Sequence, residues 1–200
     1  MSAPELVDAE RSVVLVIDLQ GKLMELIHRP RLVIAATRRL LQLAEIFRIP
    51  VLLSEQYPKG LGPTHPEVAQ VFESLTVEKR MLAKTSFGCC GDKQFEQTLN
   101  ELRPGVKPSE RQLIVAGIEA HVCVMATVIE LLRSGQQVHL CWECVSGRGE
   151  EYRRHALERM QQAGACITNH ESVGFEWARD KDHAQFKAMN RLLRDGQIVN

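Results

Sequence analysis

The chain has 200 residues, of which 44% are hydrophobic, and its 25 Lys and Arg residues balance 25 Asp and Glu residues. A formal charge of zero excludes a broad basic surface, so we expect neither nucleic acid nor a membrane as a partner. The length indicates one globular domain over 1–200. An acidic N-terminal segment and the lack of long apolar runs predict a cytoplasmic protein whose six cysteines are thiols.

Short apolar runs alternate with amphipathic segments along the chain. The predicted strands are 13–17, 50–54, 76–79, 112–116, 137–142 and 164–167. The predicted helices are 31–48, 91–102, 121–134, 150–163 and 181–195. This alternation favours a parallel sheet with helices on both faces. Prolines and glycines in 55–75 predict a long irregular loop, which in a compact domain is typical of a functional segment.

Polar residues at the ends of the apolar strands are the first candidates for a site, because ligands of open parallel sheets bind at the carboxyl edge. Asp18 follows the first strand, Lys84 the third and Cys123 the fourth. Each alone has another explanation: a helix cap, a solvated lysine and a buried thiol. Together they supply a base, a cation and a nucleophile. We expect the cation and the helix start to lower the pKa of the thiol.

The chain contains three segments that match a known family in their order and separation: VVLVIDLQ, AKTSFG and GIEAHVCV. They resemble the isochorismatase-like cysteine hydrolase superfamily over residues 12 to 170. With SEQYPKGLGPTHPE they resemble its isochorismatase-domain-containing branch. The resemblance implies a three-layer α/β/α fold, Rossmann-like, with a six-stranded parallel sheet.

The resemblance also implies a mechanism and the residues that perform it. Asp18, Lys84 and Cys123 are expected to form a catalytic triad that hydrolyses a small amide, imide or ester through a thioester. A cis peptide bond is expected between Ile118 and Glu119. The backbone N–H groups of Glu119 and Cys123 would form an oxyanion hole. The Glu119 side chain is either part of the site or a solvent-facing acid.

Four further residues are candidates for the walls of the pocket, because they are near the triad in sequence or lie in the long loop: Gln20, Leu23, Tyr57 and Phe87. Each of them is otherwise ordinary packing or surface. Aromatic residues make up only 5% of the chain, which favours a small carbonyl compound as the substrate.

Several motifs argue against a metal or another cofactor. Nicotinamidases of the superfamily carry an Asp-x-His metal pair after the second strand, where this chain reads Ser54-Glu55-Gln56-Tyr57. His65 lacks a companion at ligand spacing. Cys141 and Cys144 form a CxxC string within a predicted strand, and residues three apart in a strand point to opposite faces. We therefore expect no metal, no cofactor and no redox pair there.

Other interpretations of the thiols remain open. His121, two residues before Cys123, is ranked below Asp18 as the base, since its ring can equally face solvent or another subunit. Cys89 and Cys90 either line the pocket or pack at a helix entry. The alternatives to a hydrolase are a binding or regulatory module on the same fold and a redox sensor acting through Cys89, Cys90 or Cys123. The apolar helix 121–134 predicts a homo-oligomer.

Overall fold

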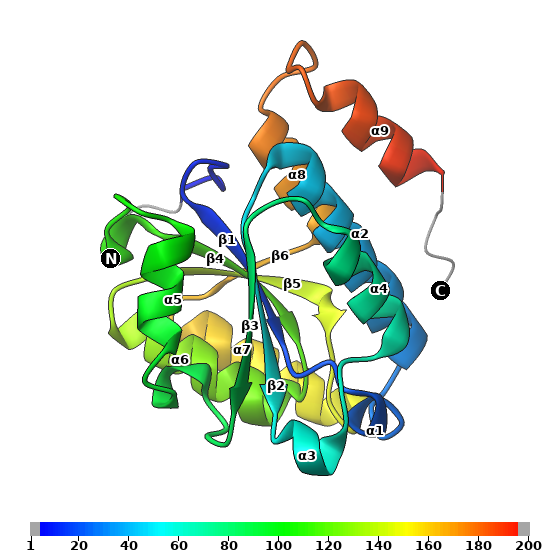
Figure 1. Cartoon of the computed structure of the whole chain (residues 1–200), viewed down its shortest axis with the longest axis vertical. Helices are drawn as coiled ribbons and strands as arrows, with labels where there is room; N and C mark the ends of the chain where they lie inside the picture. The colour runs from blue at the N-terminus through cyan, green and yellow to red at the C-terminus, as the bar shows by residue number, and fades with distance from the viewer. Residues whose placement is uncertain (1–4, 196–200) are drawn as a thin grey trace.

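Six parallel strands form one sheet between two layers of helices in the computed structural model, which describes residues 5–195 (Figure 1). The strand order is β3-β2-β1-β4-β5-β6. The strands are β1 (Ser12–Ile17), β2 (Val51–Gln56), β3 (Lys79–Lys84), β4 (Gln112–Gly117), β5 (Gln137–Val145) and β6 (Cys166–Thr168). This three-layer architecture confirms the predicted fold class. The outermost parts of the expected domain, 1–4 and 196–200, lie outside the described residues.

The helices cover the two faces of the sheet (Figure 1). On one face lie α2 (Pro30–Phe47), α4 (Pro66–Ser74), α8 (His170–Ala178) and α9 (Phe186–Arg194). On the other lie α5 (Phe95–Leu102), α6 (Met125–Arg133) and α7 (Glu150–Gln162). The remaining helical turns are α1 (Gly21–Met24), α3 (Pro58–Leu61), two 3-10 turns at Cys89–Gly91 and Pro108–Glu110, and a π-helical turn at Ala120–Val124. None of the helices within residues 5–195 combines the length and the apolar content needed to cross a bilayer.

Strand β1 shows why the central strands are continuous apolar runs. Val14 and Val16 pack in the core under α2, whereas Leu15 and Ile17 pack in the core under α6. Successive side chains of a strand point to opposite faces, and helices cover both faces here. Every residue of β1 is therefore buried, without the alternation of polar and apolar residues that marks a half-exposed strand.

The third strand lies at the edge of the sheet and is shifted from its predicted position. We predicted 76–79, but β3 spans Lys79–Lys84. Its residues are mostly exposed or half-buried because β3 pairs only with β2. An edge strand of this kind carries charged side chains and gives a weak apolar signal. The correction places Lys84 at the end of the strand rather than beyond it.

The segment 55–75 is more regular than predicted. Strand β2 runs to Gln56, and two helices, α3 and α4, follow. Pro58 and Pro66 are each the first residue of a helix, where a missing backbone N–H costs nothing. These prolines begin helices instead of excluding them, so the long-loop prediction is wrong for most of the segment.

The register between β4 and β5 is interrupted by a bulge. Leu140 pairs with Val115, yet Val145 already pairs with Gly117, so β5 has extra residues over this interval. The bulge changes which face the following side chains occupy. Cys141 and Cys144 consequently lie in the same core cluster, under α2. The prediction that they point to opposite faces is wrong.

The neighbouring strands β1 and β4 define the place where a ligand is expected. From β1 the chain continues to β2 on one side, and from β4 it continues to β5 on the other. The carboxyl ends of two such strands open a crevice at the switch point of a parallel sheet. The segments after Ile17 and after Gly117 therefore meet there, with Ile118 N donating to Ile17 O at 2.9 Å.

Candidate functional site

The three predicted site residues converge at the carboxyl edge of the sheet. Asp18 directly follows β1, Lys84 ends β3, and Cys123 lies in the π-helical turn between β4 and α6. All three are buried, with exposed fractions of 0%, 3% and 6%. Residues that are far apart along the chain are thus brought together by the strand order.

Lys84 and Asp18 form a buried ion pair. The Lys84 Nζ atom lies 2.6 Å from Asp18 Oδ2, and both side chains are almost fully inaccessible. The same ammonium donates to Gln56 Oε1 at 2.8 Å and to the Phe87 carbonyl at 3.0 Å. A buried ion pair is stable only when its remaining donors and acceptors are also paired. The solvated-lysine interpretation of Lys84 is therefore wrong.

The second oxygen of the Asp18 carboxylate is also occupied. Ser54 Oγ donates to Asp18 Oδ1 at 2.7 Å, and the Cys89 thiol donates to Ser54 Oγ at 3.6 Å. Helix α1 begins after Gln20, so Asp18 does not cap it. The carboxylate is held by side chains from β2 and β3, which fixes its orientation beside the switch point.

Sequence reasoning did not identify Ser54 and Gln56 as partners of the ion pair. Both are buried at the end of β2, between the strands that carry Asp18 and Lys84. The available signal was a polar stretch, 54–56, directly after an apolar strand, which is the same signal that selected Asp18. We interpreted these residues only as evidence against a metal pair.

Cys123 is a protonated thiol in the resting protein. Burial, followed by the charge of Asp18, raises the pKa of Cys123 to about 12, although Lys84 opposes the shift. The thiol donates a hydrogen bond to Asp18, which also favours the protonated form. The prediction of a lowered pKa is therefore wrong: the Lys84 ammonium lowers the pKa of the sulfur as expected, but burial and the Asp18 charge together raise it by more.

Glu119 lies next to Cys123 with its side chain buried rather than facing solvent. Its carboxylate accepts from Arg148 Nε, with both oxygens at 3.1 Å, and lies 3.4 Å from His121 Nε2. The peptide bond between Ile118 and Glu119 is cis. Among the described residues, no backbone acceptor pairs with the backbone N–H of Glu119.

His121 has contacts of its own away from the ion pair. Its ring stacks on Tyr152 at a centroid distance of 4.8 Å, and its Nε2 faces Glu119. The half-buried ring also lines a surface pocket of about 410 Å³ with Met125 and Arg159. His121 therefore faces Tyr152 and Glu119, whereas the Cys123 thiol is hydrogen-bonded to Asp18.

The four predicted wall residues have different environments. Gln20 is fully buried, and its side-chain amide binds the backbone of Gln56 and the carbonyl of Gly62, so it holds the chain after β2. Leu23 packs against the core under α2. Tyr57 and Phe87 are 54% and 64% exposed.

A pocket at the edge of the sheet is open to Lys84. It has a volume of about 270 Å³ and is lined by Tyr57, Pro58, Lys59, Ala83, Lys84 and Thr85. Tyr57 thus shares a cavity with a member of the ion pair. A cavity of this size accommodates a small ligand rather than a polymer.

The last residues of β2 do not fit the nicotinamidase metal pair. Glu55 Oε1 accepts from the backbone and hydroxyl of Thr64, both at 2.7 Å. Gln56 Oε1 accepts a hydrogen bond from Lys84 Nζ. The polar atoms at this position are therefore committed to the protein itself. Among residues 5–195, one group of three side chains has metal-ligand spacing, Cys141, Glu143 and Cys144, and it lies elsewhere.

The three-layer arrangement around a six-stranded parallel sheet defines a protein of the α/β class, with a buried ion pair at the carboxyl edge of the sheet. The family model for the isochorismatase domain matches residues 12–172. This chain belongs to that family. Isochorismatase domain-containing protein 2 of Danio rerio is 37% identical over 182 residues, which covers 91% of this chain and 86% of the relative.

Other relatives agree in length and fold. Isochorismatase domain-containing protein 2 of Homo sapiens is 34% identical over 184 residues, which covers 92% of this chain and 83% of the relative. Among solved structures, one described as a MAR1 ribonuclease from Caenorhabditis elegans has a TM-score of 0.86 at 33% identity. The match covers 98% of this chain and 95% of that chain.

Proposed function

We propose that this protein is a metal-independent cysteine hydrolase that acts on a small amide, imide or ester through a thioester on Cys123. The observation that carries the proposal is the buried Asp18 carboxylate, which is paired with Lys84 at 2.6 Å and accepts a hydrogen bond from the Cys123 thiol. A nucleophile within hydrogen-bonding reach of an oriented base is the arrangement that covalent catalysis requires.

The first half of the reaction forms the thioester. Asp18 takes the proton from Cys123 as the sulfur attacks the carbonyl carbon of the substrate. Because the pKa of the resting thiol is raised to about 12, attack and proton transfer are coupled instead of starting from a standing thiolate. The protonated Asp18 then gives its proton to the leaving amine or alcohol as the carbon–nitrogen or carbon–oxygen bond breaks.

The second half hydrolyses the thioester. Asp18, ionised again, accepts a proton from a water molecule that attacks the carbonyl carbon. The carbon–sulfur bond breaks, the sulfur recovers the proton, and the acid product leaves. Lys84 stays paired with Asp18 and holds the carboxylate in place between the proton transfers.

The charge that develops on the carbonyl oxygen needs hydrogen-bond donors. The backbone N–H groups of Glu119 and Cys123 are our candidates. The Glu119 N–H supports this role because it has no backbone acceptor among the described residues and lies in the turn that carries the nucleophile. Removing one such donor typically lowers the rate by about 10²- to 10³-fold.

The test is a screen of small amides, imides and esters with intact-mass detection of an adduct. We expect a substrate-derived mass on Cys123, turnover with wild type, and neither with Cys123→Ala. Cys90→Ala, which removes an exposed thiol, is the matched control and should turn over like wild type. Equal hydrolysis by Cys123→Ala would overturn the proposal. A screen without substrates, combined with a protein contact that survives Cys123→Ala, would instead favour a regulatory module.

RNA belongs in the same screen because the Caenorhabditis elegans neighbour carries the name of a ribonuclease. We propose a carbonyl substrate for this chain instead. Its formal charge is zero, and the buried cation Lys84 is already paired with Asp18. Cleavage of RNA that is lost in Cys123→Ala would contradict this choice.

We further propose that the chain forms a homo-oligomer. Helix α6 and the turn before it keep apolar side chains partly exposed, namely Val122, Met125 and Ile129. Light scattering after size exclusion should give more than one chain per particle. Met125→Glu, which places a charge on this surface, should lower the particle mass. A monomeric wild type at micromolar concentration would contradict the proposal.

A further inference from the structure

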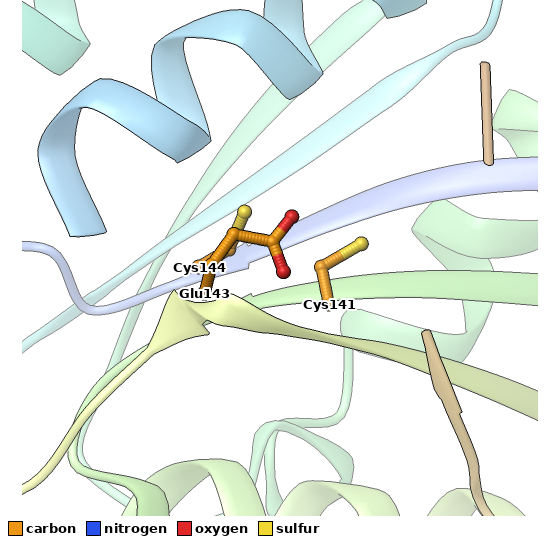
Figure 2. A group of neighbouring side chains, drawn as sticks. All are labelled: Cys141, Glu143 and Cys144. Carbon is orange, nitrogen blue, oxygen red and sulfur yellow. The ribbon is translucent and has the colours of Figure 1, made fainter. Parts of the chain in front are cut away.

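A second group of reactive side chains lies on the other face of the sheet from Cys123. Cys141, Glu143 and Cys144 of β5 project toward the layer of α2 (Figure 2). Their sulfur and carboxylate oxygen atoms all lie within 4.8 Å of one another, and all three residues are buried. Cys123 belongs to the core under α6, so this group is separate from the proposed catalytic triad.

Within residues 5–195, the Glu143 carboxylate is fixed through one oxygen only. Glu143 Oε1 accepts from the backbone N–H of His170, the first residue of α8, at 2.5 Å. The His170 Nδ1 atom lies at 2.5 Å from the same oxygen. These two contacts set the orientation of the carboxylate from the first turn of a neighbouring helix.

The other carboxylate oxygen has no partner. Glu143 Oε2 is inaccessible and forms no hydrogen bond within the described part of the chain, although Glu143 is only 4% exposed. Figure 2 shows the carboxylate between the two sulfur atoms. An ionised oxygen in such surroundings is costly unless a donor or a cation meets it. A bound cation would supply the partner that this oxygen lacks among the described residues.

We propose that Cys141, Cys144 and Glu143 bind a zinc ion. Thiolate sulfur with a carboxylate oxygen is a donor set that Zn²⁺ accepts, and tetrahedral geometry places two zinc-bound sulfurs about 3.8 Å apart. The two sulfur atoms lie within 4.8 Å of each other, so zinc binding requires only a small contraction of this distance. A water molecule takes the fourth position. His170 then acts as an outer partner that orients the carboxylate ligand.

The proton balance of binding follows from the state of the thiols. Burial raises the pKa of Cys144 well above its ordinary value. Binding breaks two S–H bonds, forms two Zn–S bonds and releases two protons to solvent. The divalent charge offsets most of the three negative charges that the ligands then carry.

The main experiment uses the full chain, stripped with a chelator and reloaded with Zn²⁺ or Co²⁺. We expect one zinc ion per chain after dialysis and, with Co²⁺, a sulfur-to-metal charge-transfer band. Cys141→Ser/Cys144→Ser should abolish both signals. The matched control, Cys90→Ser/Cys166→Ser, removes two exposed thiols and should retain both. His170→Gln should weaken zinc binding by about 10- to 100-fold.

A measurement on the unmodified protein keeps the test independent of whether the variants fold. X-ray absorption at the zinc edge should show two sulfur neighbours. A sulfur-free shell or no retained ion would overturn the proposal. Loss of the ion in Cys123→Ser would also overturn it, since that residue is not in the site.

Discussion

At the scale of single residues, Asp18 is the centre of the site. One of its oxygens accepts a hydrogen bond from Lys84 and the other accepts one from Ser54. The carboxylate also accepts a hydrogen bond from Cys123. A carboxylate with several donors is held in one orientation. The same contacts explain why the thiol remains protonated until a substrate arrives.

Removing the ammonium should destabilise the fold. Lys84→Met leaves the Asp18 charge buried without its cation, which costs about 3–5 kcal/mol in the free energy of unfolding. Urea unfolding measures this loss. Lys181→Met, which breaks the exposed pair with Asp182, should change stability by less than about 1 kcal/mol. If Asp18→Asn/Lys84→Met is no more stable than Lys84→Met, the loss does not come from an uncompensated charge.

Alkylation of Cys123 should report its raised pKa. Only the thiolate reacts, so the rate with iodoacetamide should keep rising by roughly tenfold per pH unit beyond pH 9. An ordinary thiol, with a pKa near 9, would level off there. Peptide mapping by mass spectrometry follows the modification of Cys123 alone. A plateau by about pH 10 would show that the thiol is not held in its protonated form by burial and Asp18.

At the scale of elements, the carboxyl ends of β1 and β4 set the position of the nucleophile. Gly117 ends β4 with a φ of 140°, and a Cβ atom there would lie 2.3 Å from the Ile17 carbonyl oxygen. Glycine allows the two strands to approach at this point. The turn that carries Glu119 and Cys123 starts from this close contact.

Gly117→Ala should therefore disturb both stability and the site. We expect a loss of about 3 kcal/mol in the free energy of unfolding, because the new methyl group meets backbone that cannot move aside. Gly105→Ala is the matched control: its φ is also positive, 83°, but no atom lies within 4 Å of the new Cβ. It should cost only ~1 kcal/mol. Equal losses in both variants, measured by urea unfolding, would remove the argument for a close approach.

At the scale of the whole molecule, the two cores under α2 and α6 both bury thiols. Cys89 and Cys123 lie under α6, and Cys141 and Cys144 lie under α2. Burial raises the pKa of Cys89 and Cys144, and the pKa of Cys141 is raised even though its hydrogen bond with Cys144 opposes the shift. The folded state without a bound metal ion thus holds protons on sulfur that the unfolded chain releases at lower pH.

This difference predicts a loss of stability in alkali. A folded-state pKa above the unfolded value of 9 contributes stability that is complete below pH 9 and decreases as the pH rises toward 12. At pH 10 the loss from Cys123 alone is up to about 1.4 kcal/mol. Urea unfolding between pH 8 and 10 should therefore show a smaller decrease for Cys123→Ser than for wild type. If the free energy of unfolding decreases equally with pH in both proteins, the loss does not come from Cys123.

Local patterns along the chain were sufficient to predict the alternation of elements and the residues at the strand ends. Apolar runs, helical periodicity and turn residues each lie within one segment, so they predicted the parallel sheet and the positions of Asp18 and Cys123. The same local signals placed β3 poorly, because an edge strand is only partly covered. They also missed the helices that begin at Pro58 and Pro66.

Which side chains meet became known only from the folded arrangement. Ser54 reaches Asp18 across 36 positions and Lys84 reaches it across 66, and such contacts depend on strand order and register rather than on local sequence. A bulge in β5 placed Cys141 and Cys144 on one face, against the period of two. Burial set the protonation of Cys123. The physical reason is common to all three: side-chain contacts and desolvation arise between segments, and no single segment contains them.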